Sequence, residues 1–113
     1  MNILLTPDLR KHLLDNNAFA REQDHIPVVK WFAPWGAATW ILTEMEQDGD
    51  TCFGLCDLGM GEPELGYVSL REVMSLKGPY GLKIERDEHF HPTKPLSAYV
   101  EAARRDRRVV EVD

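Results

Sequence analysis

The sequence predicts one α+β domain, in which a mainly antiparallel sheet of about five strands combines with an N-terminal, a short middle and a C-terminal helix. Three observations predict this class. The chain has 113 residues, the usual size of a single domain. Short runs rich in β-branched and aromatic residues alternate with turn residues, and helix-start signals stand before, between and after these runs. Since 43% of the residues are hydrophobic and 28% are charged, one core can be filled, and we expect residues 1–113 to form a single domain.

The first element is a helix that begins at Pro7. Thr6 is a favourable N-cap, proline is tolerated at the first helical position, and Asp8 places a negative charge in the first turn. An apolar stripe follows at helical spacing and consists of Leu9, Leu13 and Leu14. Asn16-Asn17 predicts the end of this helix, and residues 18–25 are expected to form a connection or a frayed extra turn.

Three strands come next, at residues 28–33, 38–46 and 51–57. Asp48-Gly49 separates the second from the third, and this pair is typical of a two-residue hairpin turn. The cross-strand neighbours expected from such a turn are Ile41 with Cys56, Met45 with Cys52, and Leu42 with Leu55. Because both faces of this hairpin are then apolar, we expect it to lie in the centre of the sheet, covered on both sides.

The second half of the chain predicts two further strands and two helices. Residues 59–63 form a loop and residues 65–69 a strand, after which Ser69 opens a capping box that predicts a helix to about Leu76. Glycines and a proline at 77–81 end that helix, and a fifth strand is expected at 82–86. The last helix is expected from Leu96 to Arg105. Two alternatives stay open for the end of the chain, a flexible tail over 104–113 or an edge strand within it.

The distribution of charge along the chain limits the classes of partner that the protein could bind. The net charge is −6, and no Lys or Arg occurs between Trp31 and Leu70. Seven acidic residues fall in this basic-free stretch, namely Glu44, Glu46, Asp48, Asp50, Asp57, Glu62 and Glu64. Because such a stretch repels phosphate, we expect no direct binding of nucleic acid. Neither an export signal nor a membrane segment is evident, since the apolar run at 3–5 is short, and we expect a cytoplasmic protein with no membrane partner.

The two cysteines do not indicate a disulfide or a nucleophile. On an extended segment Cys52 and Cys56 lie roughly 13 Å apart, too far to be bonded. Neither has a His or a cation beside it to generate a thiolate, and no other catalytic residue is predicted. The glycines of the loop at 59–63 do not complete a dinucleotide-binding motif, because Glu64 stands where its third glycine belongs, and no cofactor is expected.

Asp87, His89 and His91 have the spacing of metal ligands. Alternate residues of an extended segment point to the same side, so one carboxylate and two imidazoles could hold iron or zinc there. The alternative is that these side chains lie on the surface or pair with Arg86 and Lys94.

Three tryptophans occur within ten residues. Trp31 and Trp40 fall on expected strands and are interpreted as core residues. Trp35 lies in a Pro-Trp-Gly turn, where an aromatic side chain either packs on the core or contacts a partner.

Long ordered strings of the sequence resemble one family. They are LLTPDLRKHLL at 4–14, FGLCDLGMGEPELGYVSLRE at 53–72 and GPYGLKIERDEHFHPTKPLSAY at 78–99, together with VVKWFAP and ATWILTE. These blocks are similar to short bacterial proteins catalogued as domain of unknown function 2958 (DUF2958), and the resemblance extends to about Ala103. It implies a stand-alone cytoplasmic protein of the kind often encoded on plasmids and other mobile elements. It implies no activity and no catalytic residue.

The leading hypothesis is a non-enzymatic accessory or adaptor protein that acts through protein contacts. These contacts are expected at the acidic loop 57–64 and at the segment 85–94. The candidate binding residues are Asp57, Glu62, Glu64, Tyr67, Arg86, Lys94 and Trp35. Two alternatives stay open, a metal-dependent enzyme that uses Asp87, His89 and His91, and an acidic mimic of nucleic acid.

Overall fold

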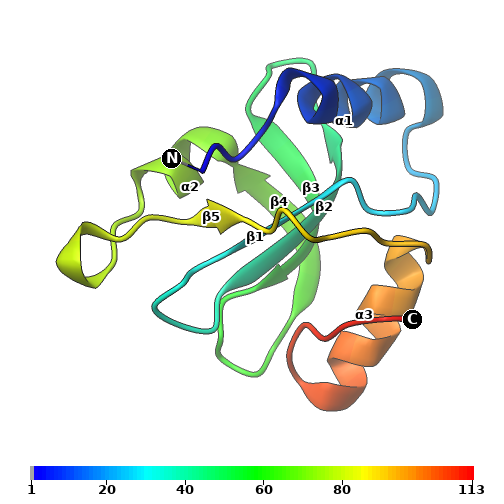
Figure 1. Ribbon diagram of the computed structural model, residues 1–113. Helices are drawn as coiled ribbons and strands as arrows, with labels where there is room; N and C mark the ends of the chain where they lie inside the picture. Colours follow the sequence, from blue (N-terminus) through cyan, green and yellow to red (C-terminus); the bar gives the residue numbers. More distant parts are fainter. Residues whose placement is uncertain (1) are drawn as a thin grey trace.

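The computed structural model describes residues 2–113 and confirms the α+β class (Figure 1). One antiparallel sheet has its strands in the spatial order β4-β3-β2-β1-β5. The strands are β1 (Val29–Phe32), β2 (Thr39–Met45), β3 (Thr51–Asp57), β4 (Glu64–Ser69) and β5 (Glu85–Arg86). The helices are α1 (Pro7–Ala20), α2 (Leu70–Ser75) and α3 (Leu96–Asp106), with a 3-10 turn at Pro79–Gly81. Of the helices formed by residues 2–113, none combines the length and the apolar character needed to cross a membrane.

The sheet is packed on both faces, as the apolar pattern of its central hairpin predicts. Figure 1 shows α1 and α2 on one face and α3 on the other. The first core cluster joins the first two helices to the sheet and includes Leu13, Trp31, Trp40, Leu42, Met45 and Val73. The second joins α3 to the opposite face and includes Ile41, Leu55, Leu96, Tyr99 and Ala103. Both tryptophans that were interpreted as core residues are therefore confirmed as buried.

Helix α1 begins where its capping signal indicates but ends later than predicted. The N–H of Leu9 donates to the Thr6 hydroxyl at 3.2 Å. The helix continues through Asn16 and Asn17 to Ala20, so the predicted end was wrong. Both asparagine side chains reach β2 instead of their own backbone: Asn16 donates to the carbonyl of Thr43 at 2.9 Å, and Asn17 to Oε1 of Glu44 at 3.2 Å. With these partners they no longer compete for helical backbone groups.

The central hairpin has the predicted register only near its turn. Met45 faces Cys52 as expected, but a β-bulge between Leu42 and Glu44 shifts every later pair, so that Ile41 faces Leu55 and Leu42 faces Gly54. The expected pairs Ile41 with Cys56 and Leu42 with Leu55 were therefore wrong. Glycine makes the bulge possible, because a Cβ at Gly54 would lie 2.0 Å from the carbonyl oxygen of Ile41.

The fifth strand is shorter than predicted. Residues 82–84 do not join it because they close a local loop, in which Lys83 bridges to Lys77 and the N–H of Gly78 donates to the carbonyl of Leu82 at 2.7 Å. Asn2 then covers the outer side of β5. Its side-chain oxygen accepts from the N–H of Arg86 at 2.6 Å, and its amide donates to the Arg86 carbonyl at 3.0 Å.

Helix α3 is confirmed, and the tail after it is ordered by packing. Arg107 adopts a left-handed conformation with φ 59°, which turns the chain back toward the sheet. Val109 and Val112 then pack against the second core cluster. Residues 104–106 belong to α3, and residues 107–113 form no strand, so the edge-strand alternative was wrong.

Candidate functional site

Two acids of the basic-free stretch shape the turn between β2 and β3. Asp48 accepts from the backbone N–H groups of Asp50 and Thr51 and from the Thr51 hydroxyl, and this hydroxyl is the main cause that lowers the pKa of Asp48. The Ser69 hydroxyl donates to Asp50 at 2.7 Å and, with the N–H of Arg71, lowers the pKa of Asp50. Both carboxylates are used within the fold.

Asp57 is also structural, although the sequence placed it in an exposed acidic loop. It is only 2% exposed. Its Oδ1 accepts from the N–H of Gly59 at 2.8 Å, and its Oδ2 accepts from the N–H of Val109 at 3.0 Å. This carboxylate fastens the C-terminal tail to the end of β3, so it is buried and hydrogen-bonded where the sequence predicts an acidic loop.

The structure brings three other candidates together beside β4. Glu62 and Glu64 are exposed, and Tyr67 is 60% exposed. With Leu58 and Met60 they line a hollow of about 270 Å³. Here two carboxylates lie next to exposed apolar side chains.

The remaining candidates lie elsewhere. Arg86 is in β5, at the opposite edge of the sheet from β4, where its Nε donates to the carbonyl of Ile3 at 3.0 Å. Lys94 is exposed in the connection to α3. The Trp35 indole packs on the first core cluster and against Gly78, where an added Cβ would lie 2.2 Å from the ring. The segments 57–64 and 85–94 therefore do not form one surface, and Trp35 is used in packing.

A larger groove lies between the end of α1, α3 and the adjoining face of β3 and β4. Its volume is about 770 Å³. Apolar side chains form its floor, and they are Phe53, Leu65, Tyr67, Leu96 and Val100. Charged side chains form its rim, with four carboxylates (Glu22, Asp24, Glu46 and Glu101) against two guanidinium groups (Arg21 and Arg104), and the buried Glu44 also lines the groove. The groove is an apolar surface inside a rim with an excess of negative charge.

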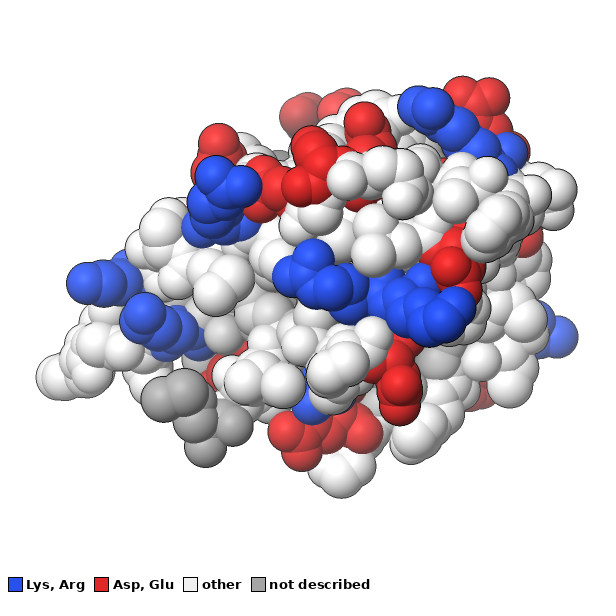
Figure 2. All heavy atoms as spheres, turned by 90° about the horizontal axis from the view of Figure 1, so that it is seen from above, with Lys and Arg blue, Asp and Glu red and all other residues white. Residues whose placement is uncertain are grey.

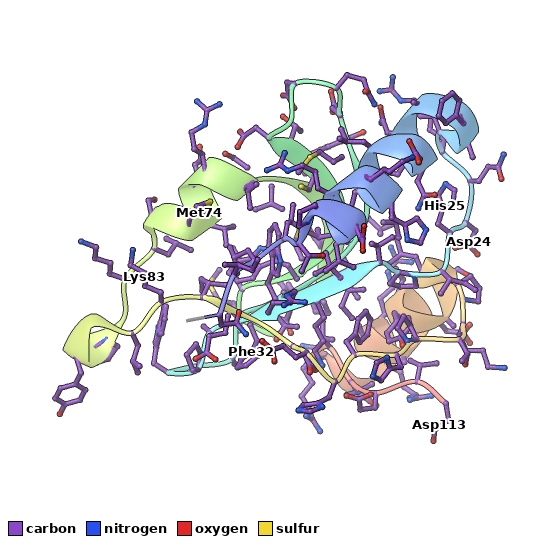
Figure 3. All side chains as sticks on the ribbon, turned by 45° about the horizontal axis from the view of Figure 1, so that its top comes forward. Asp24, His25, Phe32, Met74, Lys83 and Asp113 are labelled. Carbon is purple, nitrogen blue, oxygen red and sulfur yellow. The ribbon has the colours of Figure 1, made fainter. Side chains whose placement is uncertain are left out.

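Two of the carboxylates at the groove are held in place by the fold. Glu44 is 4% exposed and accepts from the Asn17 amide and from the N–H of Glu22, each at 3.2 Å. Asp24 lies beside the start of α3 (Figure 3), where it accepts from the N–H of Ser97 at 3.0 Å. It replaces the cap that Pro95 cannot provide. Three rim acids, Glu22, Glu46 and Glu101, have no such structural bond among residues 2–113 and can meet a partner.

The sequence did not indicate this groove as a site. Its walls come from segments far apart in the chain, which no local motif connects. One signal was present: Glu44 is a carboxylate inside an otherwise apolar strand, and a charge in such a place requires partners.

Neither cysteine is suited to nucleophilic chemistry. Both are free, as predicted. Removal from water is the largest cause that raises the pKa of Cys52, to about 12, and it also raises the pKa of Cys56, to about 11. Because the thiolate is the reactive form, both remain weak nucleophiles near neutral pH.

We expect Cys52 to resist alkylation by iodoacetamide at pH 8 in the folded protein and to react readily in urea. Raising the pH toward 12 ionises the thiol, so labelling of folded protein should accelerate with pH until the fold is lost. Mass spectrometry of the labelled peptide measures this. Rapid labelling of Cys52 at pH 8 without urea would show that the thiol is neither buried nor protonated.

The proposed metal ligands are not arranged around one point. The N–H of His89 donates to Oδ1 of Asp87 at 2.9 Å, which closes a turn and interrupts the extended alternation that a shared ion requires. Oδ2 of Asp87 instead lies 3.8 Å from Nζ of Lys30. Asp87 therefore pairs with a cation, as in the alternative to a metal site, but this cation is Lys30 and not Arg86 or Lys94. Across residues 2–113, no three His, Cys, Asp or Glu side chains are grouped so that they could hold a metal ion.

Charges of both signs mix on the side of the molecule where α1 lies. Figure 2 shows Lys and Arg side chains among Asp and Glu side chains there. This face does not present the continuous negative surface that a mimic of nucleic acid requires.

The comparisons with known proteins agree with the resemblance carried by the sequence blocks. The model of a family described as protein of unknown function (DUF2958) matches residues 4–110, nearly the whole chain. No curated protein and no solved structure matches. The chain therefore belongs to the DUF2958 family, whose function is unknown.

Proposed function

We propose that this protein is a non-enzymatic accessory or adaptor protein that binds a basic segment of a partner protein in the acid-rimmed groove. The observation that carries this proposal is the groove itself, in which an apolar floor lies inside a rim of four carboxylates and two guanidinium groups. The resemblance to proteins of mobile elements suggests that the partner is another product of the same element.

Floor and rim have different roles in this proposal. The exposed parts of Leu65 and Tyr67, together with Phe53, provide apolar area whose removal from water favours binding. The free rim acids Glu46 and Glu101 select a partner with Lys or Arg and speed its association. No cation is available from β2, β3 or β4 to neutralise Glu46, because residues 32–69 contain no Lys or Arg. Glu101 lies on α3, where Arg104 lines the same groove.

The test is an array of short synthetic peptides in Lys/Arg-rich, uncharged and Asp/Glu-rich sets of equal apolar content. We expect the protein to bind the basic set, and binding to weaken as NaCl rises from about 0.05 M to about 0.5 M because salt screens exposed charges. Removing both rim charges, Glu46→Gln with Glu101→Gln, should weaken binding about tenfold.

The matched control removes two exposed acids away from the groove, Glu72→Gln with Asp113→Asn, and should change affinity by less than about twofold. Equal binding of the three peptide sets, or equal losses in the two double variants, would contradict the proposal.

A further inference from the structure

The two edges of the sheet are treated differently by the fold. β5 has only two residues, and the Asn2 side chain occupies both the N–H and the carbonyl of Arg86 on its outer side. β4 has six residues and forms the other edge. Natural proteins usually cover or shorten an edge strand, because its unpaired backbone groups can pair with another chain.

Before its last residue, Ser69, the outward-facing backbone groups of β4 belong to Leu65 and Tyr67. The N–H of Leu70 donates to the carbonyl of Asp50 at 2.9 Å, so residue pair 50 and 70 is hydrogen-bonded. Bonded and non-bonded pairs alternate along an antiparallel ladder, and Gly66 and Val68 therefore bond to β3 while residues 65 and 67 face away from it. Within residues 2–113, the N–H groups of Leu65 and Tyr67 have no hydrogen-bond acceptor on that outer side.

Two hollows lie along β4. Leu65 and Tyr67 point to the α3 face, where the Tyr67 ring lies 5.2 Å from that of Phe53, and they line the large groove. Glu64 and Gly66 alternate with them and point to the opposite face. They line the small hollow, at which Leu65 and Tyr67 also contribute. A Cβ at Gly66 would meet no atom within 4 Å, so there is free space on that side.

An added strand matches this arrangement, because its successive side chains point to opposite faces of the sheet. One set would enter the large groove and the other the small hollow. Both hollows have acidic rims, with Glu46 and Glu101 at the first and Glu62 and Glu64 at the second. A second copy of β4 would bring the same acids to this place, whereas a basic segment would neutralise them.

We infer that the partner's basic segment binds as an extended strand that pairs with the outer edge of β4 and places alternate side chains in the two hollows. This inference rests on the proposed function and specifies how the partner is bound. Main-chain hydrogen bonds to Leu65 and Tyr67 provide affinity, and the two hollows provide selectivity.

The first experiment uses the Lys/Arg-rich array peptide that binds most tightly and wild-type protein. Single N-methyl groups are introduced along the peptide. We expect methylation at every second residue to weaken binding at least tenfold, because those N–H groups face β4, and methylation at the intervening residues to leave it nearly unchanged. Amide hydrogen exchange of Leu65 and Tyr67 should slow when the peptide binds.

The second experiment compares Tyr67→Pro with Tyr67→Ala, and Leu65→Pro with Leu65→Ala. Each pair removes the same side chain, but only proline also removes the outward N–H, and it leaves the bonds between β3 and β4 in place. Each proline variant should bind the peptide at least tenfold more weakly than its alanine partner. Circular dichroism verifies that each variant is folded. If a proline variant does not fold, the binding of the N-methylated peptides to wild-type protein tests strand addition instead.

The outcomes separate the two proposals. A basic peptide that binds with no alternating methylation pattern, and with no protection of Leu65 and Tyr67, would overturn strand addition while the acid-rimmed groove remains supported. If no basic peptide binds, both proposals are wrong.

Discussion

Replacing Gly54 with alanine is expected to lower the free energy of unfolding by about 3 kcal/mol or more, or to prevent folding. The new Cβ would lie 2.0 Å from the carbonyl oxygen of Ile41 and 2.8 Å from Cα of Leu42. Both are backbone atoms of the adjacent central strand, which a rotamer change cannot move. The bulge in β2 would have to open, and the buried groups around it would lose their packing.

The sheet provides a closely matched control, because Gly66 faces Gly54 in the neighbouring strand. An added Cβ at Gly66 meets nothing within 4 Å, so Gly66→Ala should stay within about 0.5 kcal/mol of wild type. Urea unfolding followed by tryptophan fluorescence measures both variants. Equal stability of the two would mean that β2 does not approach β3 as closely as described.

Replacing Asp57 with alanine is expected to cost about 2–4 kcal/mol and to release the C-terminal tail. The carboxylate is buried and accepts from the N–H groups of Gly59 and Val109. Without it the N–H groups of Gly59 and Val109 lose their acceptor in partly buried positions. Asp57→Asn should give a smaller loss, since an amide has one oxygen that can accept and one nitrogen that cannot.

Thermal unfolding and amide exchange at Val109 measure these effects. Asp106→Ala is the control, because Asp106 lies near the same tail but forms its ion pair with the adjacent Arg105 on the surface. We expect it to change stability by less than about 0.5 kcal/mol. Unchanged protection of Val109 in Asp57→Ala would show that packing of the valines alone holds the tail.

The elements that were predicted correctly depend on residues close in sequence. The caps at Thr6 and Ser69 form as their motifs indicate, since a cap involves groups only three residues apart. The errors arise where a distant partner decides. α1 continues past Asn16 because that side chain finds the backbone of β2, and β2 bulges because the strand opposite has Gly54.

In the candidate site, too, the sequence indicates contacts between residues close in the chain and not contacts with distant partners. Glu62, Glu64 and Tyr67 line one hollow because a loop and the strand after it keep them together. The burial of Asp57 could not be foreseen, since one of its donors is 52 residues later in the chain. The metal hypothesis assumed that residues 87–91 stay extended, but Asp87 accepts from a backbone N–H two residues on, as aspartate often does at a turn.

The amide of Asn2 also limits how large an assembly can become. With the outer side of β5 occupied by Asn2, the sheet can be extended only at β4, and a partner strand bound as proposed would make it six-stranded. Copies of the chain cannot polymerise head to tail through their sheets, because each offers one free border and not two. Complexes formed through β4 should therefore be finite, with one guest for each host molecule.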